Sequence, residues 1–354
     1  MLRVGLILSL LVTVAACETI GYYGQAALGQ GRLLLARRSV EAVIADPATA
    51  EAVRRPLVAS REMLRFAADE LGLPVEERYR DYVALDGDAV VWNLFAAPRF
   101  DVTLLQWCFP IAGCVSYRGY FDEGAARRKA AQLAAEGFDV HVGPVAAYST
   151  LGWFDDPMLS TFIGREPADL AELLFHELAH GVVYVPSATA FNESFASFVA
   201  AEGVRRWLRA QDDGTAIERW TARAERRRAF VGAALAARER LAAGYRQARA
   251  DGLDDAAMEA VRTALWAEIR TTWLAERDPG LAPWDPFFLA APSNARLGTV
   301  ADYNAHVPEF AALLDDCGGR LDCFLERVRA LAEGPASARE AFLAADPAGV
   351  QTSR

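Results

Sequence analysis

The chain has 354 residues, of which 53% are hydrophobic and 24% are charged, and its formal net charge is -10 at pH 7. This composition is typical of a folded globular protein and excludes an extended disordered chain, and the length allows one large core or two closely packed lobes. The negative net charge gives the chain no general reason to bind nucleic acid.

The N-terminal segment has the pattern of an export signal. Within residues 1–16, Arg3 precedes an apolar run over residues 4–14, as in a secretory signal peptide. Cys17 follows two alanines in an arrangement that resembles a bacterial lipobox, so we expect Cys17 to be lipidated and to tether the protein to a membrane. Because Glu18 comes next, the expected location is the outer membrane, facing the periplasm. A plain signal peptide or an uncleaved anchor is the alternative, although the run is short for a membrane span.

Residues 17–80 are predicted to form an N-terminal helical segment. Between Tyr22 and Asp69, apolar and charged residues alternate at helical spacing, with Leu33 and Val43 among the expected core positions. Such a helical pair carries no chemistry of its own and would support the part of the chain that does.

A different pattern begins near Tyr82. Residues 89–97 and 101–109 are predicted strands, residues 123–136 a helix, and Val140 marks a further strand. We therefore expect a small mixed sheet inside a central unit that spans residues 81–210.

Apart from Cys17, the cysteines form two close pairs, Cys108 with Cys114 and Cys317 with Cys323. An exported protein meets an oxidising compartment, so two local disulfides are expected. Four cysteines allow three connectivities, and a metal site is a competing interpretation, but structural zinc sites usually have shorter spacings.

The most informative segment is residues 173–180, LLFHELAH. On a helix, His176 and His180 project from one face and can bind a single Zn²⁺, while Glu177 suits a general base acting on a water held by the metal. This is the HExxH pattern of zinc hydrolases. The alternative is an ordinary apolar helix with two histidines at its border, but the chain has only four histidines in total.

A catalytic zinc site needs one more protein ligand. Pro186 is expected to end the first helix, and Thr189 or Asn192 to cap a second one. In this second helix Phe191 and its aromatic neighbours are expected to pack against the first helix while Glu193 points back to the metal as third ligand. The alternative for Glu193 is a solvated glutamate at a helix start.

Residues 211–354 are expected to be a helical region that packs on the core, or part of one integrated domain. Within it, the arginine-rich stretch 223–228 has the pattern of a solvated helix face with ion pairs.

HELAH followed by NESFAS resembles the gluzincin metallopeptidases. Residues 108–121, 147–157 and 292–310 resemble a family of bacterial aminopeptidases expected to be lipoproteins. The resemblance implies an α+β, predominantly helical fold with a small sheet beside the HExxH helix. The connection from His180 to Glu193 is shorter than in the large members of the group.

The same resemblance implies further site residues. An edge strand over residues 147–151 would bind the substrate backbone, Tyr303 would stabilise the oxyanion, and His306 is an alternative donor. The expected substrate-binding residues are Tyr148, Ser149, Thr150, Trp153 and Asp156. An acidic residue there would pair with a free α-ammonium, although a turn packed by aromatics is an equal alternative. Glu172 would orient a ligand imidazole or face solvent.

The sequence thus predicts an exported, lipid-anchored zinc aminopeptidase with one Zn²⁺ per chain and a peptide as substrate. The alternatives are a zinc endopeptidase of the same fold and a binding lipoprotein whose metal is only structural. The intact Glu177 argues against the last, because a structural site has no need of a base.

Overall fold

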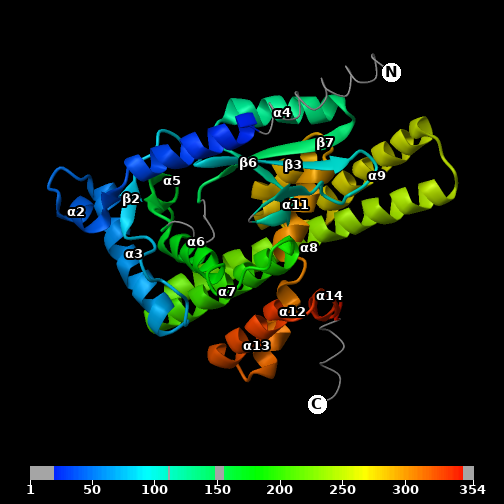
Figure 1. Cartoon of the computed structure of the whole chain (residues 1–354). Coiled ribbons are helices and arrows are strands. Elements are labelled where there is room, and N and C mark those ends of the chain that lie inside the picture. The colour runs from blue at the N-terminus through cyan, green and yellow to red at the C-terminus, as the bar shows by residue number, and fades with distance from the viewer. Residues whose placement is uncertain (1–19, 111, 148–154, 346–354) are drawn as a thin grey trace.

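The computed structural model describes residues 20–110, 112–147 and 155–345, in which helices predominate and the strands form small sheets (Figure 1). The predicted α+β class is therefore confirmed. Cys17 and residues 1–16 lie outside the described part. No helix among the described residues is both long and apolar enough to cross a membrane.

The main sheet has the strand order β6-β3-β7 and is antiparallel throughout. It consists of β3 (Val91–Pro98), β6 (Arg118–Tyr120) and β7 (Phe138–Val145). Side chains alternate between its two faces. One face, which includes Leu94 and Ala96 of β3, packs on α4 (Glu123–Ala135). Figure 1 shows α4 on this side of the strands and α11 on the other.

Two smaller strand assemblies flank this sheet. The first has the order β1-β2-β8 and is mixed, with β1 (Arg38–Ser39) antiparallel and β8 (Met158–Leu159) parallel to β2 (Asp81–Val83). The second is a hairpin of β4 (Trp107–Phe109) and β5 (Gly113–Val115). A disulfide between Cys108 and Cys114 closes the hairpin, as predicted.

The N-terminal part is more divided than the predicted helical pair. Residues 20–35 are helical, and the short strand β1 separates them from α2 (Val40–Ala45) and α3 (Glu51–Asp69). Val40, at the start of α2, hydrogen-bonds Arg80 next to β2. This segment is therefore tied into the first small sheet as well as into the helical core.

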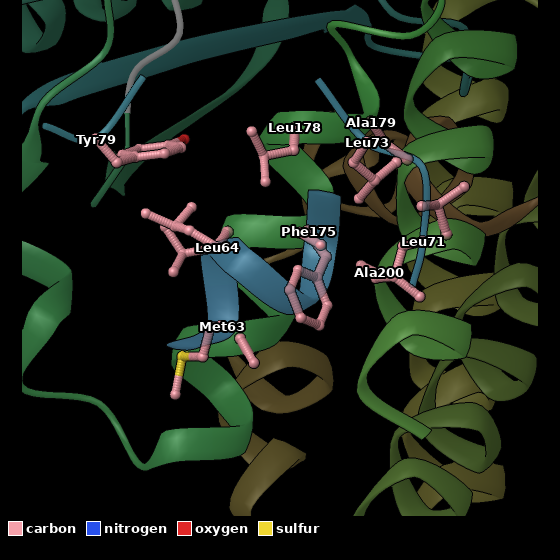
Figure 2. Packing of buried hydrophobic residues seen from close by; sticks show 14 of the residues in the cluster. Met63, Leu64, Leu71, Leu73, Tyr79, Phe175, Leu178, Ala179 and Ala200 are labelled. Atoms are coloured by element: carbon pink, nitrogen blue, oxygen red, sulfur yellow. The ribbon is translucent and has the colours of Figure 1, made fainter. Parts of the chain in front are cut away.

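Two helices form the centre of the molecule, α6 (Pro167–Ala179) and α7 (Thr189–Ala210). A one-turn helix, α5 (Ser160–Ile163), precedes them. Figure 2 shows Phe175 of α6 in the core, with Leu71 and Ala200 beside it. The two helices approach closely at Gly203, where an added Cβ would lie 2.8 Å from both Leu71 and Phe175. A glycine is required there because the space is already filled.

A long antiparallel helical hairpin, α8 (Gly214–Ala250) and α9 (Asp255–Glu276), extends to one side (Figure 1). It is followed by η1 (Pro279–Trp284), α10 (Asp285–Leu289) and α11 (Asn294–Asn304). Asp139 of β7 anchors the start of α11 because it accepts hydrogen bonds from Asn294 N (2.8 Å) and from Arg262 of α9 (2.7 Å). This buried network fixes α11 against the end of the sheet.

The last helices, α12 (Val307–Asp316), α13 (Leu321–Glu333) and α14 (Ala336–Leu343), pack beneath α7 (Figure 1). Phe191 and Phe195 contact Phe310, and Phe198 contacts Phe324. The aromatic face of α7 was predicted to pack against the HExxH helix, but its rings are directed to α12 and α13. The predicted Cys317–Cys323 disulfide links these two helices.

Three local predictions need correction. The strand predicted over 101–109 is limited to β4, because Asp101 accepts a hydrogen bond from Thr103 N and forms a turn there. The first metal-site helix ends at Ala179, well before Pro186. Neither Thr189 nor Asn192 caps α7, since the N-cap is Ala188. The predicted helix over 123–136 and the strand at Val140 are confirmed by α4 and β7.

Candidate active site

Helix α6 positions three of the predicted functional side chains. Its buried stripe includes Leu170, Leu174 and Leu178, so the opposite part of the helix turns His176 and Glu177 towards a cavity. His180 is the C-cap residue and lines the same cavity. The end of the helix therefore brings both histidines to the cavity.

Glu193, in the second turn of α7, meets both imidazoles. His176 Nε2 lies 3.3 Å from His180 Nε2, and Glu193 Oε2 lies 3.3 Å from His176 Nε2 and 3.7 Å from His180 Nε2. Around a tetrahedral zinc with bonds of about 2.0–2.1 Å, neighbouring ligand atoms are ~3.3 Å apart. These three residues form a group that could hold a metal ion, and their spacing fits one.

The chemistry of the atoms also fits a cation. The Oε2 atom of Glu193 is buried and makes no well-formed hydrogen bond, and two imidazole nitrogens face each other at contact distance. Buried polar atoms without hydrogen bonds are costly. A metal at the centre of the triangle would satisfy all three.

Asn192 fixes the short connection between the two helices. Its side chain accepts a hydrogen bond from Val185 N (2.9 Å) and donates one to Val185 O (2.8 Å). Asn192 is thus inside α7 but holds the preceding loop against the helix, which sets the direction in which Glu193 projects.

Burial and mutual charge shift the pKa values of these groups. Burial alone would raise the pKa of Glu193, but the nearby imidazoles of His180 and His176 outweigh it and lower the pKa to about 2. Burial raises the pKa of Glu177 above its usual value, although both histidines oppose the shift. Glu193 is therefore suited to remain an anionic ligand, and Glu177 to exchange a proton.

Tyr303 of α11 reaches the same site. Its ring stacks on His176 with centroids 6.2 Å apart, and it lines the cavity. Burial, followed by the charge of Glu193, raises the pKa of Tyr303 well above its usual value, so the hydroxyl keeps its proton. The neighbouring Asp302 hydrogen-bonds Ser116, which ties this end of α11 to the segment between β5 and β6.

The cavity beside the site has a volume of about 950 Å³. Its floor is the second face of the main sheet, with every second residue of β3 and β7 exposed to it, and its walls include α6, α11 and the helix of residues 20–35. The lining residues of these two strands are Val91, Asn93 and Phe95 of β3 and His141, Gly143, Pro144 and Val145 of β7.

The other predicted site residues are placed differently. Asp156 is buried and does not line the cavity, but its charge contributes to the raised pKa of Glu177. The Glu172 carboxylate binds Arg227 of α8 (2.5 Å), so it does not orient an imidazole. His306 lies 3.4 Å from Glu309 and is not part of the cavity lining.

The predicted substrate residues Tyr148, Ser149, Thr150 and Trp153 lie outside the described part of the chain, as does most of the expected edge strand over 147–151. Ala147 alone is described there, and it lines the cavity.

Two contributors to this cleft were not predicted from the sequence. The first is the helix of residues 20–35, which supplies Tyr22 and Tyr23 and packs Gly29 against Phe121. The second is the sheet floor with Asn93. The two-residue alternation in the predicted strand around Asn93 indicated that the strand has a second face besides the one in the core. It did not indicate that this second face lies beside His176, His180 and Glu193.

The fold and the site define an α+β protein with a His–His–Glu group, able to hold a metal ion, at the edge of a large cleft. Residues 21–343 match the family model described as "Putative aminopeptidase", and the chain belongs to that family. No curated protein and no solved structure gives a significant match.

Proposed function

We propose that this protein is a zinc-dependent peptide-bond hydrolase with a gluzincin-like core, and that it acts as an aminopeptidase. The observation that carries the proposal is the triangle of His176, His180 and Glu193, whose spacing matches three corners of a zinc tetrahedron, with Glu177 adjacent. Membership in the aminopeptidase family supports a peptide as the substrate.

Zinc is the metal that this donor set favours. Two imidazole nitrogens and one carboxylate oxygen suit a borderline cation that accepts tetrahedral geometry, whereas calcium and magnesium prefer sites built from oxygen alone. When bound, zinc would act as a Lewis acid that polarises the scissile carbonyl and makes water a stronger acid.

The protein's own groups divide the proton transfers. Glu177 takes the proton of the attacking water and passes it to the leaving amine, a role that its raised pKa favours. Tyr303, protonated and adjacent to His176, donates a hydrogen bond to the carbonyl oxygen as negative charge develops on it. The sheet floor and α6 hold the peptide between them and exclude water.

A second candidate function is an endopeptidase of the same fold. Among the described residues that line the cleft, Glu177 and Glu193 are the only carboxylates, and both already have roles. A free α-ammonium would find no additional acidic partner among them, which favours acceptance of internal or blocked peptide segments.

We further propose that the protein is exported and anchored through a lipid on Cys17. The support is the sequence pattern alone, a signal-like run followed by two alanines and a cysteine. Metabolic labelling with a palmitate analogue would detect the lipid, and Cys17→Ala should abolish the label.

Hydrolysis of short amino-acyl amides tests the main proposal. The zinc-loaded protein should cleave them, and Glu177→Gln should retain zinc while kcat falls by about 10²–10⁴. A fully active Glu177→Gln variant would refute the assignment of the base. Cleavage of free-amine substrates but not of their N-acetylated forms supports the aminopeptidase, and efficient cleavage of both supports the endopeptidase.

A further inference from the structure

The floor of the cleft carries a buried amide that the proposed chemistry does not use. Asn93 lies in the middle of β3, the central strand of the main sheet, and is 8% exposed. Its side chain makes no hydrogen bond with any described residue, yet it lines the cavity. A carboxamide whose donor and acceptor open to the cleft is available to bind a polar group of a ligand.

Two glycines make room beside this amide. In the strand register, Asn93 pairs with Gly119 of β6 on one side and with Gly143 of β7 on the other, so all three positions face the cleft. Without side chains at these neighbours, the row across the three strands is a depression with Asn93 at its centre. Glycines of this kind are found where another backbone approaches a sheet closely.

The cleft-facing neighbours of the depression on β3 and β7 are apolar or neutral side chains. His141, the next residue of β7 to face the cleft, stacks on Phe95, and burial together with the charge of Arg296 lowers its pKa, which keeps the imidazole neutral. A charged group of the substrate would find no ion-pair partner among these cleft-facing strand residues. A neutral group with both a donor and an acceptor would match the carboxamide, which has the same two functions.

We propose that Asn93, Gly119 and Gly143 form a subsite that binds a backbone peptide group of the substrate. The Asn93 carbonyl accepts the hydrogen bond of the peptide N–H, its NH₂ group donates to a peptide C=O, and the glycines allow the chain to lie against the sheet. This inference rests on the proposed peptidase function, and it makes Asn93 a binding residue for extended peptides whether their amino ends are free or blocked.

Equilibrium binding tests the subsite without turnover. The zinc-loaded Glu177→Gln protein is titrated calorimetrically with N-acetyl-tetraalanine amide and with analogues in which each backbone N–H is replaced in turn by an ester oxygen. At one position the ester should weaken binding roughly 5- to 100-fold, because a hydrogen bond is lost and Asn93 is left unpaired. In the double variant Glu177→Gln, Asn93→Leu, the parent peptide should bind more weakly by a similar factor. The ester at the sensitive peptide position should then weaken binding no further.

The subsite proposal would be refuted if the ester weakened binding equally with and without the Asn93→Leu change. It would also be refuted if a well-folded, zinc-loaded protein bound no tetrapeptide. As a control, Gln106→Leu removes an exposed amide that donates a hydrogen bond to Leu104 O outside the cleft, and it should leave all affinities unchanged. If Asn93→Leu does not fold, Gly143→Ala replaces it. Its new Cβ would lie 3.4 Å from His141, a distance that the fold accommodates, and it should fill the depression and weaken the parent peptide at least fivefold. Unchanged affinity in Gly143→Ala would also overturn the subsite.

The binding experiment and the hydrolysis assay test the subsite and the peptidase proposal separately. If the ester effects depend on Asn93 but the wild-type protein hydrolyses no peptide, the peptidase proposal is wrong and the amide-binding subsite stands.

Discussion

Tyr303 and His176 lie far apart in the sequence, yet their rings are nearly parallel, with centroids 6.2 Å apart and 19° between the planes. The contact joins α11 to α6. Because α11 is fixed at one end by Asp139 and at the other by the hydrogen bond between Asp302 and Ser116, the tyrosine hydroxyl is held in place before a substrate arrives.

Removing that hydroxyl should affect turnover but not the metal. Tyr303→Phe keeps the stacked ring, so we expect unchanged zinc content and KM within about threefold, with kcat lower by about 10²–10³ because one hydrogen bond to the developing charge is lost. Steady-state kinetics on a peptide amide, with metal analysis, measures both. A kcat within twofold of wild type would exclude Tyr303 as the oxyanion donor.

The proposed role of Glu193 as third metal ligand can be tested against a matched control variant on α6. Glu193→Gln should weaken zinc binding by at least about 10-fold, because a neutral amide replaces the anionic oxygen of the triangle. Glu172→Gln makes the same chemical change at a carboxylate that binds Arg227, and it should leave the zinc affinity unchanged. Competition with a fluorescent chelator gives both constants. Equal affinities in the two variants would remove Glu193 from the ligand set.

Glycine at position 203 should matter for stability. An alanine there would overlap Leu71 and Phe175, so we expect Gly203→Ala to lower the free energy of unfolding by roughly 1–2 kcal/mol despite the better helix propensity of alanine. Gly232→Ala, on an exposed part of α8 with nothing within 4 Å, should instead raise it by about 0.5–1 kcal/mol. Urea unfolding of both variants checks the opposite signs.

The ion pairs of Glu202 predict a pH-dependent contribution to stability. Burial opposes the shift, but hydrogen bonds from Arg205 and Arg206 lower the pKa of Glu202 below 4.5. Arg206 also donates to Gly319 O, which joins α7 to the loop before α13. Near pH 7, Glu202→Gln should reduce the free energy of unfolding by roughly 1–2 kcal/mol.

The sign of the pH effect follows from the lowered pKa. The folded state binds the Glu202 proton less readily than the unfolded state, so the stabilisation is complete above the unfolded pKa and is lost as the pH falls through the folded pKa. Denaturation curves of wild type and Glu202→Gln should therefore differ at pH 7 and converge in acid. A difference that stays constant between pH 7 and pH 3 would contradict this account.

The triangle of His176, His180 and Glu193 was predictable because its residues depend on local rules. Helical periodicity places His176 and His180 on one face, and the requirement for a third ligand points to the next helix. The extent of the helices was harder to predict, since α6 ends at Ala179 in a local turn and not at the helix-breaking Pro186. Asn192 illustrates the limit: its type is typical of a cap, but its side chain holds Val185 from inside the helix.

The cleft could not be predicted from any single segment of the sequence. Its floor needs the pairing of β3 with β6 and β7, and no local pattern states that Asn93 lies between two glycines. The aromatic partners of α7 could not be predicted for the same reason, because Phe191 had several possible partners and the folded chain places it against Phe310.

The helix of residues 20–35 bears on how this protein should be prepared. Tyr22, Tyr23, Ala26 and Gln30 line the cleft, and Gln25 receives a hydrogen bond from Phe121 N. Deleting this segment would remove one wall of the cleft. A secreted form intended for crystallisation or inhibitor screening should therefore begin ahead of Ile20.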